Sequence, residues 1–388
     1  MSIAIIAIAY NRVNSLKRLL KSLNEAYYPS NDIPLIISID KSNTDEVERF
    51  ADDFLWEHGL KKVKKHDKNL GLKKHILEQG QELDNFDAII ILEDDVIVSP
   101  AFYCYALQSV KKYASNTDIA GISLYSFPLN NYTNYPFSAL KDSNDVFFMN
   151  IAQSWGEIWM KKSWLSFYEW YLNNKSFEPS DRIPAQLFDW KKSWLKYHTR
   201  YCSEQNKYFV YPYHSFSSNC GDLGIHAQKC YNTFQTSMQL SVEGDMKLPK
   251  SPEYGICYDC FFENKALYKV LGLSENACCL DLNCYRTPTN NQRYWLTLKK
   301  EPYAVIKSFG LKYKPIEMNV LMGLPGSDIF LYDLSQTASP PSSSFPFGYI
   351  LYMYRINDLF NLIRRYGFKA IASELKEKII RKIKLWKI

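Results

Sequence analysis

Residues 88–100 read AIIILEDDVIVSP, and the expected fold follows from this stretch. The apolar run Ala88–Leu92 suits a buried strand of a parallel sheet. Three acids, Glu93-Asp94-Asp95, follow it directly. Ser99-Pro100 then supplies an N-cap and a first-turn proline for a helix that we expect to end near Tyr113. A strand, an acidic turn and a helix in this order predict one unit of an α/β sheet.

Residues 1–125 repeat this alternation around the acidic turn. Apolar runs predict strands, and apolar residues at helical spacing predict amphipathic helices between them. Strands are expected at Ile3–Ala9, Pro34–Ile39, Lys62–Lys65 and Ile119–Leu124, and helices at Leu16–Leu23, at Thr44–His58 and from Gly71 to Leu83. Strands separated by helices predict a mostly parallel sheet with right-handed crossovers.

Beyond residue 125 the pattern is less regular, and composition suggests the divisions. Residues 126–265 are expected to complete the domain begun by 1–125, with a Trp-rich helical region from Trp155 to Tyr201. Three further segments are expected: an irregular extension at 266–334, a Pro/Ser-rich linker at 335–348 and a basic amphipathic helical tail at 349–388.

The overall composition narrows the class of protein. Of the 388 residues, 23% are charged and 46% are hydrophobic, which excludes a disordered polymer. No stretch approaches the ~20 apolar residues of a membrane span. The apolar start at 3–9 lacks the flanks of a signal peptide, so we expect a cytoplasmic protein. The net charge of +6 is too small to indicate a nucleic-acid partner.

The cysteines have two readings. Nine cysteines without an export signal favour free thiols over disulfides. The spacing of Cys257, Cys260, Cys278, Cys279 and Cys284 also occurs in zinc sites, although buried free thiols are the favoured interpretation.

The basic excess lies in the tail. Between Arg364 and Ile388 there are nine Lys or Arg residues and two Glu. A basic amphipathic helix of this kind predicts peripheral contact with an anionic membrane, here the inner face of the plasma membrane. Packing of the helix on the catalytic domain is the alternative.

The acidic turn predicts a cation. Ligands of open α/β sheets bind outside the carboxyl ends of the strands, where Glu93-Asp94-Asp95 lies. Adjacent carboxylates repel one another unless a positive charge neutralises them. Carboxylate and phosphate oxygens suit Mg²⁺ or Mn²⁺, so an ion bridging an aspartate and a diphosphate is expected. A solvated acidic turn is the alternative.

The same segment, ILEDDVIVSPAFYCY, resembles the metal-binding segment of inverting glycosyltransferases with the GT-A fold. The similarity is greatest to bacterial family 2 sugar transferases and to the N-acetylglucosaminyltransferase I group, and it spans residues 3–265. Further matching segments occur in the family order: AIAYNR at 7–12, IISIDKS at 36–42, KNLGLKKHILEQG at 68–80, SWGEIWMKKSW at 154–164, FDW at 188–190 and SNCGDLGIHA at 218–227. The resemblance implies an α/β fold of GT-A type, a Rossmann-like, mostly parallel sheet that binds a nucleotide sugar, with an irregular acceptor side.

The resemblance also implies roles on the donor side. Asp95 would be the main ligand of Mn²⁺ or Mg²⁺, Asp94 would bind the ribose or a metal-bound water, and Glu93 would support the pair. The remaining donor-binding residues would be Ala9, Tyr10, Asn11, Arg12, Asp40, Asn69, Gly71, Lys73 and His226. For Arg12, Asp40 and His226, an ordinary solvated or turn residue is the alternative.

Inversion at an anomeric carbon requires a general base on the acceptor hydroxyl. Asp189 is the predicted base, because Phe188 and Trp190 flank it and would raise its basicity. Glu157 is the rival, at a position where relatives often carry an apolar residue. The implied acceptor-binding residues are Trp155, Gly156 and Trp159, although the spacing of the tryptophans also suits core packing.

These observations predict a metal-dependent inverting glycosyltransferase. It would transfer a hexosyl or N-acetylhexosaminyl group from a nucleoside-diphosphate sugar, UDP-linked, to a cell-surface glycan or lipid-linked acceptor, in lipopolysaccharide or capsule synthesis. One alternative is a nucleotidyltransferase, but the Gly-rich loop with Arg and Lys that it needs is missing from AIAYNRVNS. The other is an inactive sugar-binding protein, against which the intact acids argue.

Overall fold

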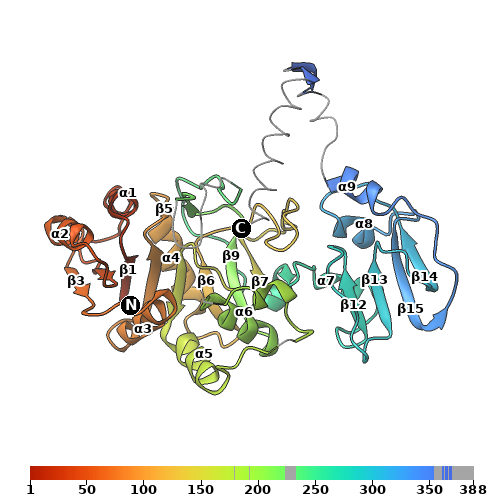
Figure 1. Cartoon of the computed structure of the whole chain (residues 1–388), viewed down its shortest axis with the longest axis horizontal. Coiled ribbons are helices and arrows are strands. Elements are labelled where there is room, and N and C mark those ends of the chain that lie inside the picture. Colours follow the sequence, from red (N-terminus) through yellow and green to blue (C-terminus); the bar gives the residue numbers. More distant parts are fainter. Residues whose placement is uncertain are drawn as a thin grey trace. The chain divides into compact units, whose positions relative to one another are not determined.

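The computed structural model describes residues 1–178, 180–191, 193–222, 233–353, 361, 363–365 and 367–368. The chain divides into two compact units, Met1–Gln292 and Arg293–Ile388 (Figure 1). None of the helices in the described ranges has both the length and the apolar character that crossing a membrane requires.

A nine-stranded sheet forms the centre of the described part of the first unit. The strand order is β11-β7-β9-β6-β8-β4-β1-β2-β3. The strands are β1 (Ile3–Ala9), β2 (Leu35–Ile39), β3 (Lys61–Lys65), β4 (Ala88–Glu93), β6 (Ile119–Ser123), β7 (Val146–Met149), β8 (Glu157–Met160), β9 (Tyr208–Pro212) and β11 (Cys257–Tyr258). A separate antiparallel ribbon joins β5 (Val96–Val98) to β10 (Ser217–Asn219).

The strand directions bring several carboxyl ends to one edge. β1 runs parallel to β2 and β4, and β6 runs parallel to β9. β8 is antiparallel to both β4 and β6, so β4 and β6 share a direction. The carboxyl ends of β1, β2, β4, β6 and β9 therefore lie along the same edge, which we call the carboxyl edge.

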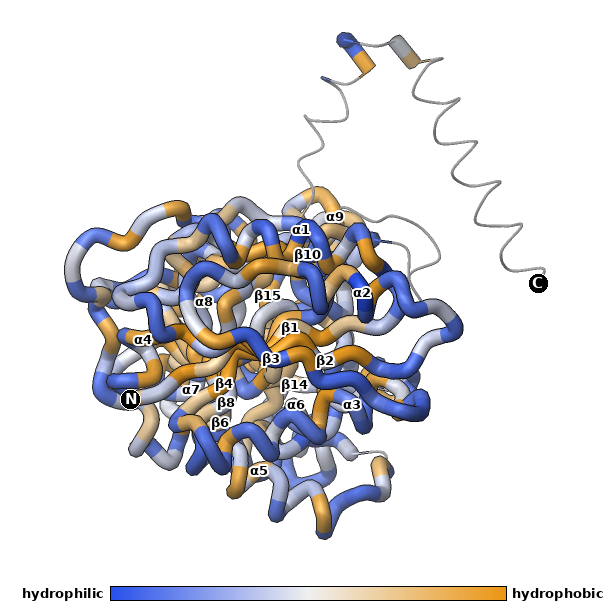
Figure 2. Tube along the Cα trace, turned by 90° about the vertical axis from the view of Figure 1, so that its left-hand side faces the viewer, coloured by the Kyte–Doolittle hydropathy of each residue, from blue (hydrophilic) through white to orange (hydrophobic). Residues whose placement is uncertain are grey.

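Helices cover both faces of this sheet and form two cores. On one face lie α1 (Val13–Asn24), α2 (Glu46–Asp53) and α4 (Phe102–Tyr113). On the other lie α3 (Leu72–Glu78), the 3₁₀ turn η1 (Gln79–Asp84), α5 (Lys161–Asn173) and α6 (Leu195–Glu204). Successive residues of a strand alternate between the cores, as Ile5 and Ile6 do. The apolar strands inside and the hydrophilic stretches outside are visible in Figure 2.

The mixed α/β fold with a large sheet is confirmed, and the strands expected before residue 125 are all present, with ends within one residue of the predictions. The helix predicted after Ser99-Pro100 begins at Phe102, directly after Ala101. Ser99 caps the turn that leads into it, because its Oγ accepts from the Ala101 N–H and its carbonyl accepts from the Phe102 N–H, both at 3.1 Å. The backbone N–H of Ser99 donates to the Phe216 carbonyl at 2.8 Å, which joins it to the loop before β10.

The Trp-rich region contains a strand where a helix was expected. Glu157–Met160 forms β8, between β4 and β6 in the middle of the sheet. All four residues are buried, and Ile158 faces one core while Trp159 faces the other. A short run buried on both faces has no alternation to distinguish it from a helix.

The rest of the first unit includes the 3₁₀ turn η3 (Pro252–Tyr254), α7 (Ala266–Leu271) and β12 (Cys278–Asp281). The predicted boundary at residue 265 therefore falls inside this unit. Among the described cysteines, Cys257, Cys260 and Cys279 are free thiols. No group of three or more His, Cys, Asp or Glu residues in the described ranges is arranged to hold a metal ion, zinc included.

The second unit is more regular than the sequence pattern indicated. β15 (Ile329–Thr337) pairs antiparallel with both β13 (Tyr294–Thr297) and β14 (Tyr303–Phe309). Along the chain, α8 (Glu317–Leu321) lies between β14 and β15, and α9 (Phe347–Met353) follows β15. The expectation of an irregular segment through residue 334 was wrong, and the linker expected from residue 335 begins only after β15. Most of the predicted tail, 349–388, lies outside the described residues.

Candidate active site

The three acids lie at the carboxyl end of β4, as expected. Glu93 is the last residue of β4, and Asp94-Asp95 forms the turn into β5. The backbone N–H of Cys220 donates to the Asp95 carbonyl at 2.8 Å, so the end of β10 lies against this turn. The turn is therefore held between a central strand and the β5–β10 ribbon.

Arg12 binds two of these acids. It precedes α1 and follows β1, the neighbour of β4 in the sheet. Its guanidinium donates to both carboxylate oxygens of Asp94, and its Nη1 lies 3.2 Å from Oδ2 of Asp95. The Asp94 side chain is 4% exposed and the Asp95 side chain is 18% exposed. Arg12 is thus part of the acidic site rather than a solvated first-turn charge.

The acids of the turn carry more negative charge than Arg12 neutralises. Burial and then the charges of Asp95 and Asp94 raise the pKa of Glu93 to about 8. Burial raises the pKa of Asp94 to about 6, and the charge of Arg12 opposes that rise. Carboxylates whose pKa values are raised in this way favour an additional cation.

The end of β2 holds the next donor-side residues together. The Asp40 carboxylate accepts hydrogen bonds from the backbone N–H groups of Leu70 and Gly71, at 2.8 and 2.9 Å. Asn69 donates from its side chain to the Lys41 carbonyl at 3.0 Å. Gly71 has φ +74°, which a residue with a side chain rarely adopts. Asp40 therefore fixes the loop that begins α3.

The other donor-side residues lie around this edge. Ala9 ends β1 and its carbonyl accepts from the Asp40 N–H at 3.0 Å. Tyr10 is half-buried and Asn11 is exposed in the turn that follows. The Lys73 ammonium lies 4.2 Å from the centre of the Tyr197 ring, so it contacts α6.

Connectivity places Asp189 near the same edge. It follows the 3₁₀ turn η2 (Ala185–Phe188) and precedes α6, which leads through a short turn into β9. α6 must therefore begin near the carboxyl edge and end near the start of β9. The contact between Lys73 in the first turn of α3 and Tyr197 in the first turn of α6 agrees with this direction. The Asp189 side chain is exposed.

Glu157, the rival base, is buried instead. It lies in β8 opposite Ile91 and has no exposed surface. One carboxylate oxygen lies 3.2 Å from Nδ1 of His198, which is also buried. Burial raises the pKa of Glu157 well above its usual value and lowers that of His198 to about 3. A protonated, buried carboxyl group is a poor general base, so the geometry favours Asp189.

We predict that Glu157→Gln removes a pH-dependent loss of stability. Above about pH 4.5 the glutamate ionises in the unfolded chain but stays protonated in the folded one. The folded state then binds the extra proton, so stability falls by about 1.4 kcal/mol per pH unit until the folded pKa is reached. Unfolding by urea from pH 5 to 8 should show the variant gaining stability over wild type as pH rises.

The matched control for this experiment is Glu253→Gln, at an exposed site. It should leave the pH dependence of wild type unchanged. If the wild-type and Glu157→Gln stabilities ran parallel across this pH range, Glu157 would be ionised in the folded protein and the assignment of a neutral side chain would be wrong.

The residues that the resemblance implies for acceptor binding do not all lie in the same place, because one of the two tryptophans is in the core and the other is partly exposed. Trp159 has no exposed surface and stacks on Trp164, with ring centres 4.0 Å apart, so it is a core residue and cannot contact a ligand in this structure. Trp155 is partly exposed and packs edge-on against Tyr125 at 4.8 Å. Gly156 precedes β8 with φ +97°.

We predict that Gly156→Ala destabilises the fold by about 1–3 kcal/mol. A Cβ at this position would lie 2.9 Å from the Cβ of Leu124, and the positive φ adds backbone strain. Chemical denaturation measures the loss. Gly244→Ala is the control, because its φ is also positive (+68°) but a Cβ there would meet nothing within 4 Å. A larger loss at Gly244 would show that backbone strain alone, rather than crowding, decides the effect.

One ion pair near the acids was not anticipated. Asp222 accepts a hydrogen bond from Ser15 Oγ at 2.7 Å and pairs with Arg18, and both partners lie on α1. Its charge also raises the pKa of Asp94. No sequence pattern indicated this pair, because Arg18 and Asp222 are far apart in the chain. His226, the predicted donor-side histidine, lies outside the described residues.

The N-terminal part of the chain matches a known family. Residues 4–167 match the model of glycosyl transferase family 2. The match covers less than half of the 388 residues and runs from β1 into α5. It confirms the resemblance to glycosyltransferases drawn from the motifs, and the sheet flanked by helices agrees with the GT-A fold. The narrower similarity to the N-acetylglucosaminyltransferase I group stays a prediction.

Among curated proteins no sequence matches the chain significantly. Solved structures that match part of the chain include S. aureus TarS 1–349 in complex with UDP-GlcNAc, at 14% identity, over 60% of this chain and 62% of that one, with a TM-score of 0.38. A second is the mannosyltransferase PcManGT from Pyrobaculum calidifontis in complex with GDP-Man and Mn²⁺, at 12% identity, over 54% of this chain and 56% of that one, with a TM-score of 0.33. A third is GalNAc-T7 with UDP, GalNAc and Mn²⁺, at 12% identity, over 55% of this chain and 42% of that one, with a TM-score of 0.39. The similarity spans less than two thirds of each of these chains.

Proposed function

We propose that this protein is a metal-dependent inverting glycosyltransferase. It transfers a sugar from a nucleoside-diphosphate sugar, UDP-linked, to a hydroxyl of a cell-surface glycan or lipid-linked acceptor. The observation that carries the proposal is the acidic turn Glu93-Asp94-Asp95 at the carboxyl end of β4, within the segment that matches glycosyl transferase family 2. This is the edge at which open α/β sheets bind their ligands.

The donor lies along the carboxyl edge in this proposal. The loop held by Asp40 presents the start of α3, where backbone N–H groups favour anionic ligands. The turn Tyr10-Asn11 and the guanidinium of Arg12 lie between this loop and the acids. The base and ribose are therefore assigned to the β1–β2 side, and the diphosphate to the side of the acidic turn.

Asp95 and Asp94 fit a Mn²⁺ or Mg²⁺ ion. Such ions are often bound by one or two carboxylates, with substrate phosphates and waters as the other ligands, so two aspartates suffice. When bound, the ion offsets the charge that develops on the departing nucleoside diphosphate. Both aspartates pair with Arg12, so a bound ion would replace part of these contacts, and the guanidinium could then bind the diphosphate.

Asp189 is assigned the role of general base, which accepts the proton of the acceptor hydroxyl. As the acceptor oxygen bonds to the anomeric carbon, the bond from that carbon to the diphosphate breaks on the opposite face, and the hydroxyl proton passes to the Asp189 carboxylate. Its exposure leaves the carboxylate free to meet an incoming hydroxyl. Trp155 at the same edge is the aromatic surface assigned to the acceptor.

A screen of nucleotide sugars tests the function. Wild type is mixed with UDP-, GDP- and other nucleotide sugars, with and without Mn²⁺, and both the unfolding temperature and donor hydrolysis are measured. We expect one UDP-sugar to stabilise the protein and to be hydrolysed slowly only when the metal is present. Equal stabilisation by the donor without any divalent cation would contradict the metal dependence, and no response to any donor would contradict the function.

A further inference from the structure

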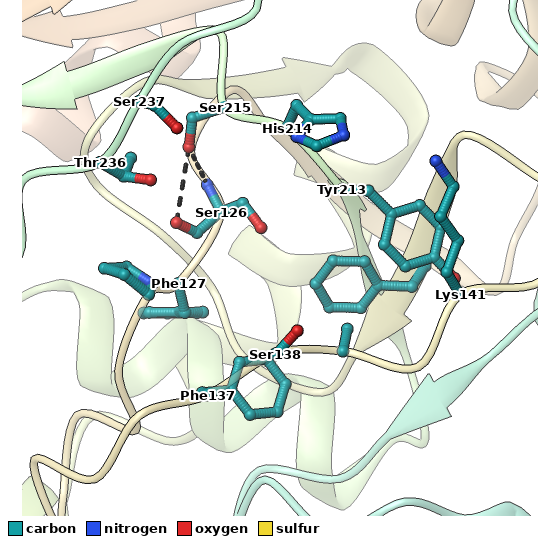
Figure 3. Close-up of a pocket in the computed structure, with 13 residues that line it drawn as sticks. Ser126, Phe127, Phe137, Ser138, Lys141, Tyr213, His214, Ser215, Thr236 and Ser237 are labelled. Atoms are coloured by element: carbon teal, nitrogen blue, oxygen red, sulfur yellow. Dashed lines mark hydrogen bonds between the residues drawn. The ribbon is translucent and has the colours of Figure 1, made fainter. Parts of the chain in front are cut away.

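A pocket lies beyond the carboxyl ends of β6 and β9, and none of the residues assigned above lines it. Its volume is about 300 Å³, at the lower end of the range for small-molecule sites. Ser126 and Phe127 come from the loop after β6, and Tyr213, His214 and Ser215 from the loop after β9 (Figure 3). The two loops are joined there, since Ser215 Oγ accepts from the Ser126 N–H at 2.6 Å.

The pocket is near the acidic turn. One chain segment connects the two places, because Ser215 lines the pocket and the Cys220 N–H binds the Asp95 carbonyl. From Ser215 to Cys220 even an extended chain spans at most about 18 Å. The rings of Trp155, Tyr125 and Phe127 contact one another in turn, with ring centres 4.8 and 5.7 Å apart, so they connect Trp155 to the pocket. The separation between the acidic turn and the pocket is within the length of an acceptor of a few sugar units.

The lining has the two features that bind carbohydrate. The rings of Phe137 and Tyr213 are partly exposed and offer apolar faces to the C–H groups of a sugar. On the opposite side, the hydroxyl groups of Ser126, Thr236 and Ser237 make no hydrogen bonds with other described residues (Figure 3). Hydroxyl groups both donate and accept, which suits the hydroxyl groups of a sugar.

One side of the pocket carries Lys141 and His214. Figure 3 shows Lys141 and His214 together at this side, next to the Tyr213 ring. The Lys141 ammonium lies 5.4 Å from the centre of that ring and forms no ion pair within the described part of the chain. The nearby Asp142 keeps its negative charge, which acts on the Tyr213 hydroxyl, but its two oxygens accept from the backbone and side chain of Asn144, both at 2.8 Å, and it forms no ion pair with Lys141 in the described part of the chain.

We propose that this pocket binds an anionic saccharide unit of the acceptor, one that carries a carboxylate or a phosphate. Lys141 binds the negative charge, His214 donates to it, and the rings and hydroxyl groups hold the sugar. This inference rests on the proposed function, because it takes the acceptor to be a glycan. It adds the substrate class, an acidic glycan whose charge lies away from the hydroxyl that reacts.

Binding of three monosaccharides to the full-length protein tests the proposal. Glucose, glucuronate and glucose 6-phosphate are titrated separately and followed by NMR, so the neutral, carboxylate and phosphate forms are compared on one ring. We expect at least one anionic sugar to bind roughly tenfold more tightly than glucose, as a charge-assisted hydrogen bond predicts. Which of the two binds identifies the source of the charge.

Lys141→Glu should abolish the preference for the anionic sugar. Lys141→Gln should lower the affinity for the anionic sugar to roughly the affinity for glucose. The control is Lys111→Glu on the exposed face of α4, which makes the same charge change elsewhere. Equal affinity for the neutral and anionic sugars, or a preference that survives Lys141→Glu, would overturn the proposal. Titration of UDP with Mn²⁺ into the same samples reports on the donor site, so failure of the proposed function is seen independently.

Discussion

Replacing Asp189 by asparagine is expected to lower the rate of sugar transfer by about two to four orders of magnitude, without weakening donor binding. Asparagine keeps the size and hydrogen-bonding capacity of the side chain but cannot accept the acceptor proton. The described donor residues lie at the carboxyl ends of β1, β2 and β4, in the turns that follow them and at the start of α3, whereas Asp189 follows η2, so the nucleotide sugar should bind as before. Transfer is measured with the donor found in the screen, and donor binding by calorimetry.

Asp181→Asn is the matched control, since Asp181 is an exposed aspartate in the same stretch before α6. It should transfer sugar at the wild-type rate. The pH profile adds a second readout, because loss of a titrating base removes the acidic limb of the wild-type curve. Transfer by Asp189→Asn within a few-fold of wild type would exclude this residue as the base.

The comparison of Asp189 with Glu157 shows what sequence reasoning could not decide. Both are acids in segments that resemble the family, so the sequence ranks them only by their neighbours. The structure separates them by burial, since Glu157 lies in the centre of the sheet beside His198 and Asp189 is exposed. Burial of this kind depends on β8 being a strand, which the spacing of the tryptophans concealed.

The acidic turn, in contrast, could be predicted from the sequence alone. β1 and β4 are apolar runs long enough to be recognised alone, and the acids follow β4 without a break. The partners of those acids were harder to predict, because Arg12 meets Asp94, and Arg18 meets Asp222, only after the strands assemble. Long-range ion pairs leave no local pattern in a single sequence. The pocket could not be predicted from the sequence either, because residues from separate loops and from β7 form it together.

Asp95→Asn is expected to weaken metal-dependent nucleotide binding by about tenfold to a hundredfold, and the rate of sugar transfer should fall as well. Asp95 is the better position for this test than Asp94. Asp94 is nearly buried and makes most of the contacts to Arg12, so its loss would leave a guanidinium without its main partner and lower stability as well. Asp95 is more exposed and shares only Nη1 of that guanidinium.

The measurement is the stabilisation of the protein by UDP at increasing Mn²⁺ concentration. Wild type should gain about 2.7 kcal/mol when the ligand reaches a hundred times its Kd, whereas Asp95→Asn should gain little at the same concentrations. Asp84→Asn, an exposed aspartate just before β4, is the control and should behave as wild type. Because Arg12 stays paired with Asp94 in Asp95→Asn, the unliganded stability should change little. A variant that lost stability without nucleotide but kept the full response to Mn²⁺ would show that Asp95 serves the fold and not the cation.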